Sequence, residues 1–100
     1  MPDLKLFYEL SIEADADISK LFDYTEAKFG FEQAVKYIRE LDSALQLLIN
    51  TPEIGKERNE IKIGLRSLPK NKHVIFYRLL EDRVWVVRVL HSSRDILKLL

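Results

Sequence analysis

The segment HVIFYRLLEDRVWVVRVL, residues 73–90, decides the fold of this chain. It contains two apolar runs, His73–Leu80 and Arg83–Leu90, which are separated by only two acidic residues. This spacing predicts two neighbouring antiparallel strands joined by a tight turn. Side chains alternate between the two faces of a strand, and in both runs each face is mainly apolar. Because an antiparallel sheet usually leaves one face polar, we expect both faces of this sheet to be covered.

Alternation divides the strand residues into two rows. The row expected to pack on helices contains Leu4, Leu6, Ile61, Ile63, Leu65, Ile75, Tyr77, Trp85 and Val87. The opposite, outer face is expected to carry Phe7, Arg66, Val74, Phe76, Arg78, Val84, Val86, Arg88 and Leu90. Arginines among apolar side chains on a sheet face indicate a surface that binds a partner. The alternative is that the arginines only form a solvated face.

Two helices precede this sheet. A strand at Leu4–Leu10 leads to Ser11, whose hydroxyl suits the N-cap of a helix. An apolar stripe with helical spacing then runs towards Gly30, which can adopt the left-handed turn that ends a helix. A second such stripe stops before Pro52 and predicts a second helix. Because the connection at Gly30 is short, the two helices are expected to form an antiparallel hairpin.

The element order is therefore β-α-α-β-β-β, with a strand at Ile61–Leu68 ahead of the two strands already described. Residues 1–100 are expected to form one α+β domain of two layers, in which the N-terminal helical hairpin packs on an antiparallel sheet. Counting chain directions places the first strand antiparallel to the last, which gives the strand order 1-4-3-2.

Composition excludes several kinds of site. The chain has no cysteine, which excludes zinc ribbons, disulfides and thiol catalysis, and two histidines alone do not make a transition-metal site. No apolar run approaches the roughly 18 residues of a membrane span, so we expect no export signal and a place in the cytoplasm. The 16 basic residues balance the 16 acidic ones, which disfavours strong nucleic-acid binding. We expect no metal, no cofactor, no membrane contact and no sequence-specific nucleic-acid binding by the chain alone.

Five short segments follow one another in a characteristic order along the chain. They are Tyr24 in the first helix, Asn50-Thr-Pro52-x-Ile-Gly55, Gly64-Leu-Arg66, His73-Val-Ile-Phe-Tyr77-Arg and Val89-Leu-His91-x-x-Arg94-Asp95. Together with the element order they resemble the ParE branch of the ParE/RelE toxin superfamily, and the resemblance covers essentially the whole chain. It implies the RelE/ParE-like fold.

The resemblance also implies a function. ParE-like toxins belong to toxin-antitoxin systems, which are associated with plasmid maintenance and stress response, and a ParD-like antitoxin neutralises them by wrapping over their surface. They act on DNA gyrase without an active site of their own, whereas RelE-like toxins cut messenger RNA in the ribosome. On this basis the outer face is expected to bind the antitoxin.

The residues favour the gyrase branch over the ribonuclease branch. RNA cleavage through a 2′-hydroxyl needs a base, an acid and cations around the phosphorane. Ser92 and Ser93 stand where the ribonuclease branch has basic residues, and no tyrosine follows Tyr77. We therefore expect a binding inhibitor and no catalytic residues. The alternatives are a ribonuclease that uses Arg66, Arg78, Arg88 and His91, and a degenerate toxin that keeps only its antitoxin contact.

The C-terminal segment is the expected contact with the target. It consists of His91, Ser92, Ser93, Arg94 and Asp95 at the rim of the sheet, where loops on a rigid scaffold often carry recognition. A catalytic triad within it is disfavoured, because triads are defined by geometry and not by proximity in sequence. The apolar tail that follows, residues 96–100, is expected to pack back over the sheet edge, and a direct gyrase contact is the alternative.

Overall fold

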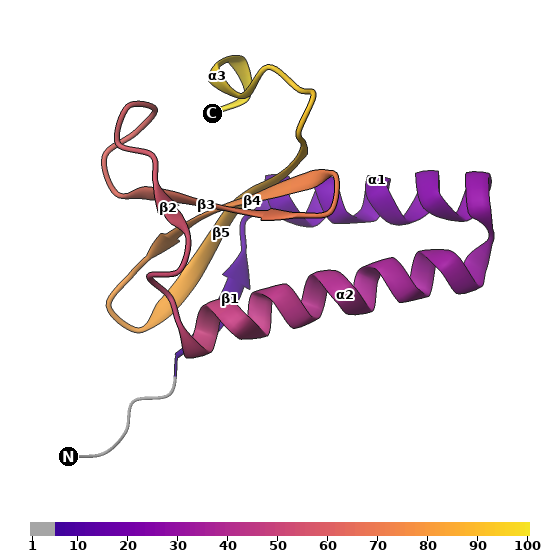
Figure 1. Cartoon of the computed structure of the whole chain (residues 1–100), viewed down its shortest axis with the longest axis horizontal. Coiled ribbons are helices and arrows are strands. Elements are labelled where there is room, and N and C mark those ends of the chain that lie inside the picture. The colour runs from indigo at the N-terminus through magenta and orange to yellow at the C-terminus, as the bar shows by residue number, and fades with distance from the viewer. Residues whose placement is uncertain (1–5) are drawn as a thin grey trace.

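A computed structural model describes residues 6–100 of the chain (Figure 1). In order along the chain it contains β1 (Phe7–Leu10), α1 (Ile12–Phe29), α2 (Phe31–Asn50), β2 (Lys56–Glu57), β3 (Leu65–Lys70), β4 (His73–Leu79), β5 (Arg83–His91) and α3 (Ile96–Leu99). The expected helical hairpin and the strands on either side of it are confirmed. The short strand β2 is additional, and Leu4 lies outside the described residues.

Local sequence sets both ends of the first helix. The Ser11 hydroxyl accepts a hydrogen bond from the Ala14 amide at 2.9 Å, which caps the N-terminus of α1. Gly30 has a φ of 95° and joins α1 directly to α2. The hairpin packs on the sheet mainly through Leu21, Leu41, Leu45 and Leu48. Within residues 6–100 no helix is long and apolar enough to cross a membrane.

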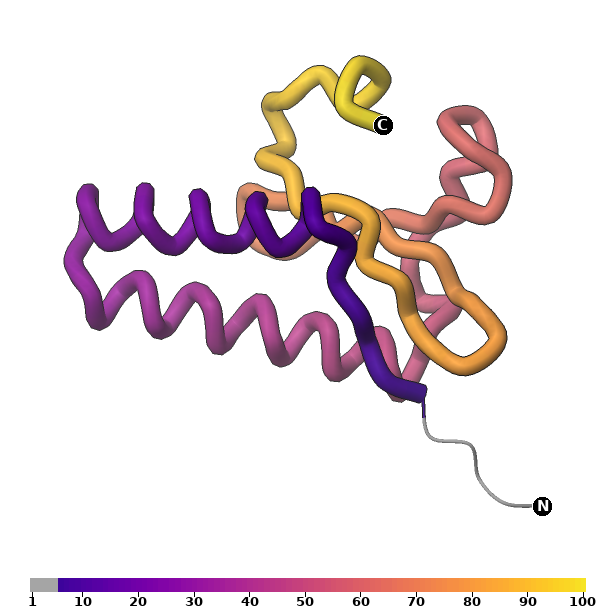
Figure 2. The backbone as a smooth tube through the Cα atoms, turned by 180° about the vertical axis from the view of Figure 1, so that it is seen from behind, coloured from indigo at the N-terminus to yellow at the C-terminus, as the bar shows by residue number. Residues whose placement is uncertain are grey.

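The five strands form one sheet in the order β1-β5-β4-β3-β2. Figure 2 shows β1 running beside β5. The expected order of the first strand and the last three is confirmed, but β1 pairs with β5 in parallel, so the antiparallel prediction was wrong. The reason is β2, which pairs antiparallel with β3. This strand adds one chain reversal and inverts the direction of every later strand relative to β1.

Because of a β-bulge in β5, the residues before the bulge lie on the opposite faces of the sheet from those we expected. Val86 and Arg88 pair with consecutive residues of β4, which leaves Val87 as an extra residue. Before the bulge, the expected faces were wrong. Val84 and Val86 are fully buried on the helix side, while Trp85 and Val87 lie on the outer face. Strict alternation cannot reveal an inserted residue.

The strand β3 begins later than expected and has its faces reversed. Ile63, expected on the helix-facing row, is 83% exposed in the loop that precedes it. Leu65 packs on the outer face, and Arg66 is the cross-strand partner of the helix-facing Tyr77. Both placements contradict the expectation. Gly64, with a φ of 84°, interrupts the extended backbone, so alternation counted from residue 61 does not carry into the strand.

The chain covers the centre of its own outer face. The helix α3 and Leu100 pack over a cluster formed by Leu65, Phe76 and Leu90, and Figure 1 shows α3 on the opposite side of the sheet from α2. We had expected Phe76 to lie open to a partner on this face, but its side chain has no exposed surface. The apolar tail does pack back on the domain, over the face of the sheet.

Candidate functional site

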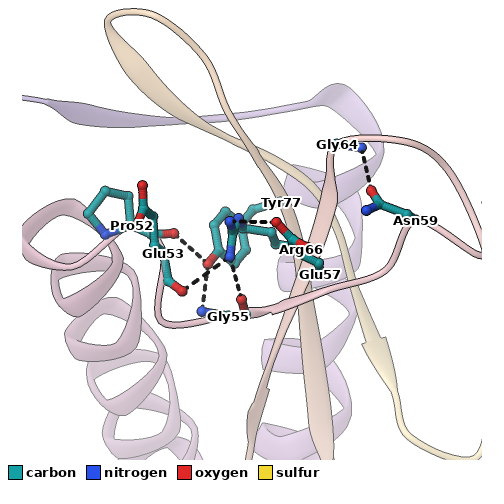
Figure 3. Close-up of polar contacts among 8 residues, drawn as sticks. All are labelled: Pro52, Glu53, Gly55, Glu57, Asn59, Gly64, Arg66 and Tyr77. Carbon is teal, nitrogen blue, oxygen red and sulfur yellow. Dashed lines mark hydrogen bonds and ion pairs between the residues drawn. The ribbon is translucent and has the colours of Figure 1, made fainter.

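Arg66 and Tyr77 hold the loop between α2 and β2 (Figure 3). Arg66 Nη1 donates to the carbonyl oxygen of Gly55 at 2.8 Å, and Nη2 pairs with the Glu57 carboxylate at 3.2 Å. The Tyr77 hydroxyl donates to the Pro52 carbonyl oxygen at 2.7 Å and accepts from the Gly55 amide at 2.9 Å. Burial raises the pKa of Tyr77, which keeps it protonated as a donor. Arg66 therefore has a structural role in holding this loop.

Arg88 joins three elements of the fold. Its Nε and Nη2 donate to the two carboxylate oxygens of Asp17 in α1, at 2.8 and 2.9 Å, and its Nη1 donates to the Leu99 carbonyl oxygen at 3.2 Å. The same carboxylate accepts from the Val89 amide at 3.0 Å. The side chains of Arg88 and Asp17 are only 18% and 11% exposed. Arg88 is thus part of a largely buried ion pair and is not presented to a partner.

The expected outer surface is most open around Phe7 among residues 6–100, and we call this part the open corner. It contains Phe7, which is 48% exposed, and the cross-strand pair of Arg78 and Trp85. The Arg78 guanidinium donates to the Ile63 carbonyl oxygen, which fixes the side chain over the corner. Val74 is half-buried against the cluster under α3.

A groove lies between the helical hairpin and the ends of β4 and β5, and it encloses about 690 Å³. Its apolar lining includes Leu21, Phe29 and Val89. Two of the expected target-contacting residues, His91 and Arg94, also line it. This volume lies in the range of sites that bind a small molecule or a few side chains of a partner. We call this feature the basic groove.

Positive charge dominates the basic groove although the chain as a whole is neutral. Four cations line it: Lys20 and Lys28 from α1, Lys72 from the turn before β4, and Arg94. The one acidic side chain among its described lining residues is Asp17, which is bound to Arg88. The site therefore favours an anionic or acidic ligand.

Sequence reasoning missed most of this groove. Lys20, Tyr24 and Lys28 are spaced by four residues, which places them in one row on the surface of α1. That spacing was visible, but nothing in the sequence brings the row against Lys72 and Arg94. The contact depends on how the hairpin lies across the sheet.

The expected target segment is held by short local contacts. The Ser92 amide donates to the Lys72 carbonyl oxygen at 2.8 Å, and the Ser93 amide donates to Nδ1 of His91 at 3.1 Å. Asp95 lies 4.0 Å from the exposed Lys98. The Arg94 side chain is exposed, and no hydrogen bond or ion pair of it is found within residues 6–100.

The groove contains both histidines of the chain. His73 and His91 are cross-strand partners with ring centroids 5.3 Å apart in an edge-to-face arrangement. The Tyr37 hydroxyl lies 2.7 Å from Nδ1 of His73. Burial, together with the nearby His91, lowers the pKa of His73, so its neutral form predominates near neutral pH.

The described lining of the groove combines apolar side chains with cations. In the described part of the chain no three metal-ligating side chains come together. Asp95 pairs with Lys98 and not with His91, so the geometry gives no Ser-His-Asp array. The basic groove has an apolar lining and cations on its rim, and this combination suits an amphipathic acidic segment of another protein.

Comparison with known proteins agrees with this architecture. Residues 8–96 match the family model described as ParE toxin of type II toxin-antitoxin system, parDE. Toxin ParE1 of Caulobacter vibrioides is 37% identical over 88 residues, which are 88% of this chain and 91% of that protein. Toxin ParE1 of Mycobacterium tuberculosis is 39% identical over 90 residues, covering 89% and 92%. A chain of the chromosomal ParDE TA system from P. aeruginosa has the same fold, with a TM-score of 0.75 at 18% identity, covering 88% of this chain and 96% of that one.

Proposed function

The chain belongs to the ParE toxin family of type II toxin-antitoxin systems, and we propose that it inhibits DNA gyrase in the cytoplasm by binding alone. The observation that carries this proposal is that three arginines of the sheet are engaged in hydrogen bonds within the chain. The ribonuclease alternative needs Arg66, Arg78 and Arg88 free to meet a phosphate. Here Arg66 is bound to the α2–β2 loop, Arg78 to the Ile63 carbonyl oxygen and Arg88 to Asp17.

These three arginines also fail to converge on His91. Arg66 faces the α2–β2 loop, Arg88 is largely buried between α1 and α3, and His91 lies in the basic groove. Proton transfer and charge stabilisation at one phosphate require groups within a few ångströms of each other. The arrangement therefore supports a toxin without catalytic residues, in agreement with the serines at positions 92 and 93.

We assign the basic groove to both the target and the antitoxin. The segment His91–Asp95 is the proposed gyrase contact, and Arg94 on the groove rim is the side chain best placed for a forked contact with a carboxylate or phosphate. The proposed ParD-like antitoxin inserts an acidic amphipathic segment into the groove and thereby covers Arg94. A second antitoxin contact is proposed at the open corner, through Phe7 and Arg78. Neutralisation then follows from occlusion of the target surface.

A supercoiling assay with purified gyrase tests the proposed activity, and primer extension on translating ribosomes tests the ribonuclease alternative. We expect loss of supercoiling and no new message ends. Message ends that appear at fixed codon positions and vanish in Arg66→Ala would refute binding-only action.

Charge reversal tests the antitoxin site. The double change Lys20→Glu with Lys28→Glu is expected to weaken binding of the antitoxin encoded beside the toxin by at least about tenfold, because it inverts one rim of the groove. Lys36→Glu, an exposed lysine of α2 outside the groove, is the matched control. Equal affinities for both folded variants would remove the groove as the antitoxin site.

A further inference from the structure

The two histidines lie in the wall of the basic groove, where a segment bound in the groove would contact them. His73 begins β4 and His91 ends β5, so their pairing places both rings side by side at the same end of the sheet. The edge-to-face contact at 5.3 Å is close enough for a charge on one ring to oppose a charge on the other. The pair therefore accepts one proton more easily than two.

Hydrogen bonding fixes where His91 carries its proton. An amide N–H can only donate, so the Ser93 amide at 3.1 Å requires a lone pair on Nδ1 of His91. Neutral His91 in this arrangement therefore has its proton on Nε2. A second proton must enter at Nδ1, where it displaces the Ser93 amide and is donated to the Ser93 hydroxyl oxygen, which lies 2.7 Å from Nδ1. Protonation of His91 thus acts directly on the turn that presents Arg94.

Cations from several neighbouring segments surround the pair, whereas the Asp17 carboxylate raises the pKa of His73. α1 contributes Lys20 and Lys28, the turn before β4 contributes Lys72, and the C-terminal segment contributes Arg94. Lys70 of β3 is the cross-strand partner of His73 on its other side. These five are all cations.

The acidic and neutral groups nearby compensate little. Asp17 is engaged by Arg88, Glu40 of α2 accepts from Asn71, and Asp95 lies near Lys98. Burial raises the pKa of Tyr37, so its hydroxyl is neutral near pH 7. Burial and His91 also lower the pKa of His73. An acidic segment in the groove reverses this balance, because its carboxylates favour the charged imidazoles.

We propose that the His73–His91 pair couples occupation of the basic groove to proton uptake, so that an acidic partner segment binds more tightly in mildly acidic solution. The proposal rests on the groove being the antitoxin site. By linkage, a complex that takes up one proton gains up to about tenfold in affinity for each unit of pH between the pKa of the bound form and the lower pKa of the free form. Between pH 7.5 and 6.0 we expect an increase of about tenfold.

Isothermal titration of the toxin with the antitoxin encoded beside it tests this coupling. Titrations at pH 6.5 in phosphate and in imidazole, which differ in ionisation enthalpy, give the number of protons taken up. We expect about one proton for the unmodified chain and markedly less for His91→Gln and His73→Gln. Protonation of the antitoxin itself persists in both variants, so each variant corrects for it.

The same variants separate a proton switch from a merely structural role. A structural defect weakens binding equally at pH 6.0 and 7.5, whereas loss of the switch flattens the pH dependence. Because the chain has only two histidines, NMR signals of the rings are assigned directly from the two variants, and at least one is expected to titrate at higher pH in the complex. An affinity that stays within twofold from pH 6.0 to 7.5, or an unchanged proton uptake in both variants, overturns the coupling. Failure of the groove itself shows separately, as unchanged affinity in the Lys20→Glu with Lys28→Glu variant.

Discussion

The buried ion pair between Asp17 and Arg88 should control whether the groove and the C-terminal segment exist as described. It ties α1 to β5 and, through the Leu99 carbonyl oxygen, to α3. The perturbation is a double-mutant cycle with Asp17→Asn and Arg88→Met. Asparagine keeps the size of the side chain and removes its charge, while methionine keeps most of the apolar stem of arginine.

The magnitude follows from the burial of the pair. Breaking a buried pair from one side costs about 3–5 kcal/mol, because the remaining charge stays without its partner. The exposures of 18% and 11% let some water reach the charges, which places each single change near the lower end, at about 3 kcal/mol. The double variant leaves no buried charge and should cost no more than either single one, so we expect a coupling energy of at least about 3 kcal/mol.

Urea denaturation at pH 7.5 measures these free energies of unfolding. Each single variant should also lose about 12 °C or more in melting temperature. The control is Glu9→Gln, since Glu9 pairs with Arg83 at 3.0 Å while the side chains are 50% and 33% exposed. The Arg83 Nε has no hydrogen-bond partner within residues 6–100, so this contact is only ionic, and its loss should cost about 0.5 kcal/mol or less. If each single variant costs less than about 1 kcal/mol, or if the two costs simply add in the double variant, the Asp17–Arg88 pair does not stabilise the fold as a coupled ion pair.

Four further outcomes are expected. Tyr77→Phe should lower the free energy of unfolding by about 2 kcal/mol in urea titrations, because the Pro52 carbonyl and the Gly55 amide both lose their partner; a neutral result would mean that water replaces the hydroxyl. Gly55→Ala should destabilise by about 2 kcal/mol or more, since an added methyl group would overlap the Tyr77 ring and hydroxyl, and an unchanged melting temperature would contradict that packing. The pKa of His73 is lowered in the folded chain, so on acidification the unfolded chain binds a proton first. The stability contributed by His73 should therefore be complete above pH about 6.5 and fall as the pH drops below it. Melting curves from pH 7.5 to 5.5 should show that His73→Gln flattens this dependence. Arg94→Ala should abolish gyrase inhibition in a supercoiling assay while changing stability by less than about 0.5 kcal/mol; full inhibition would remove Arg94 from the target contact.

Local sequence alone determined the helical hairpin and its limits. Ser11 and Gly30 act within a few residues of themselves, through an N-cap hydrogen bond and a positive φ, and the structure places both as expected. The family motifs are likewise readable from the sequence because they are contiguous. Their physical role was not readable, since Arg66 and Tyr77 act on a loop that is distant in sequence.

The faces of the strands were decided only in the tertiary structure. Alternation assumes unbroken strands, and a single extra residue at Val87 exchanged the sides of Val84 and Trp85. The two-residue strand β2 is too short to be recognised from its own residues, yet it set the direction of β1 relative to β5. Such features depend on pairing energies between segments far apart in the chain.

The basic groove belongs to the same class. Its cations come from α1, from the turn before β4 and from the segment after β5, and their convergence depends on the angle at which the hairpin crosses the sheet. The sequence determined that this chain folds as a helical hairpin on a sheet and resembles ParE toxins. Only the tertiary structure decided that Arg66 and Arg88 stabilise the fold and that four other cations, Arg94 among them, line an open site, because charge takes its role from the partner that packing brings within reach.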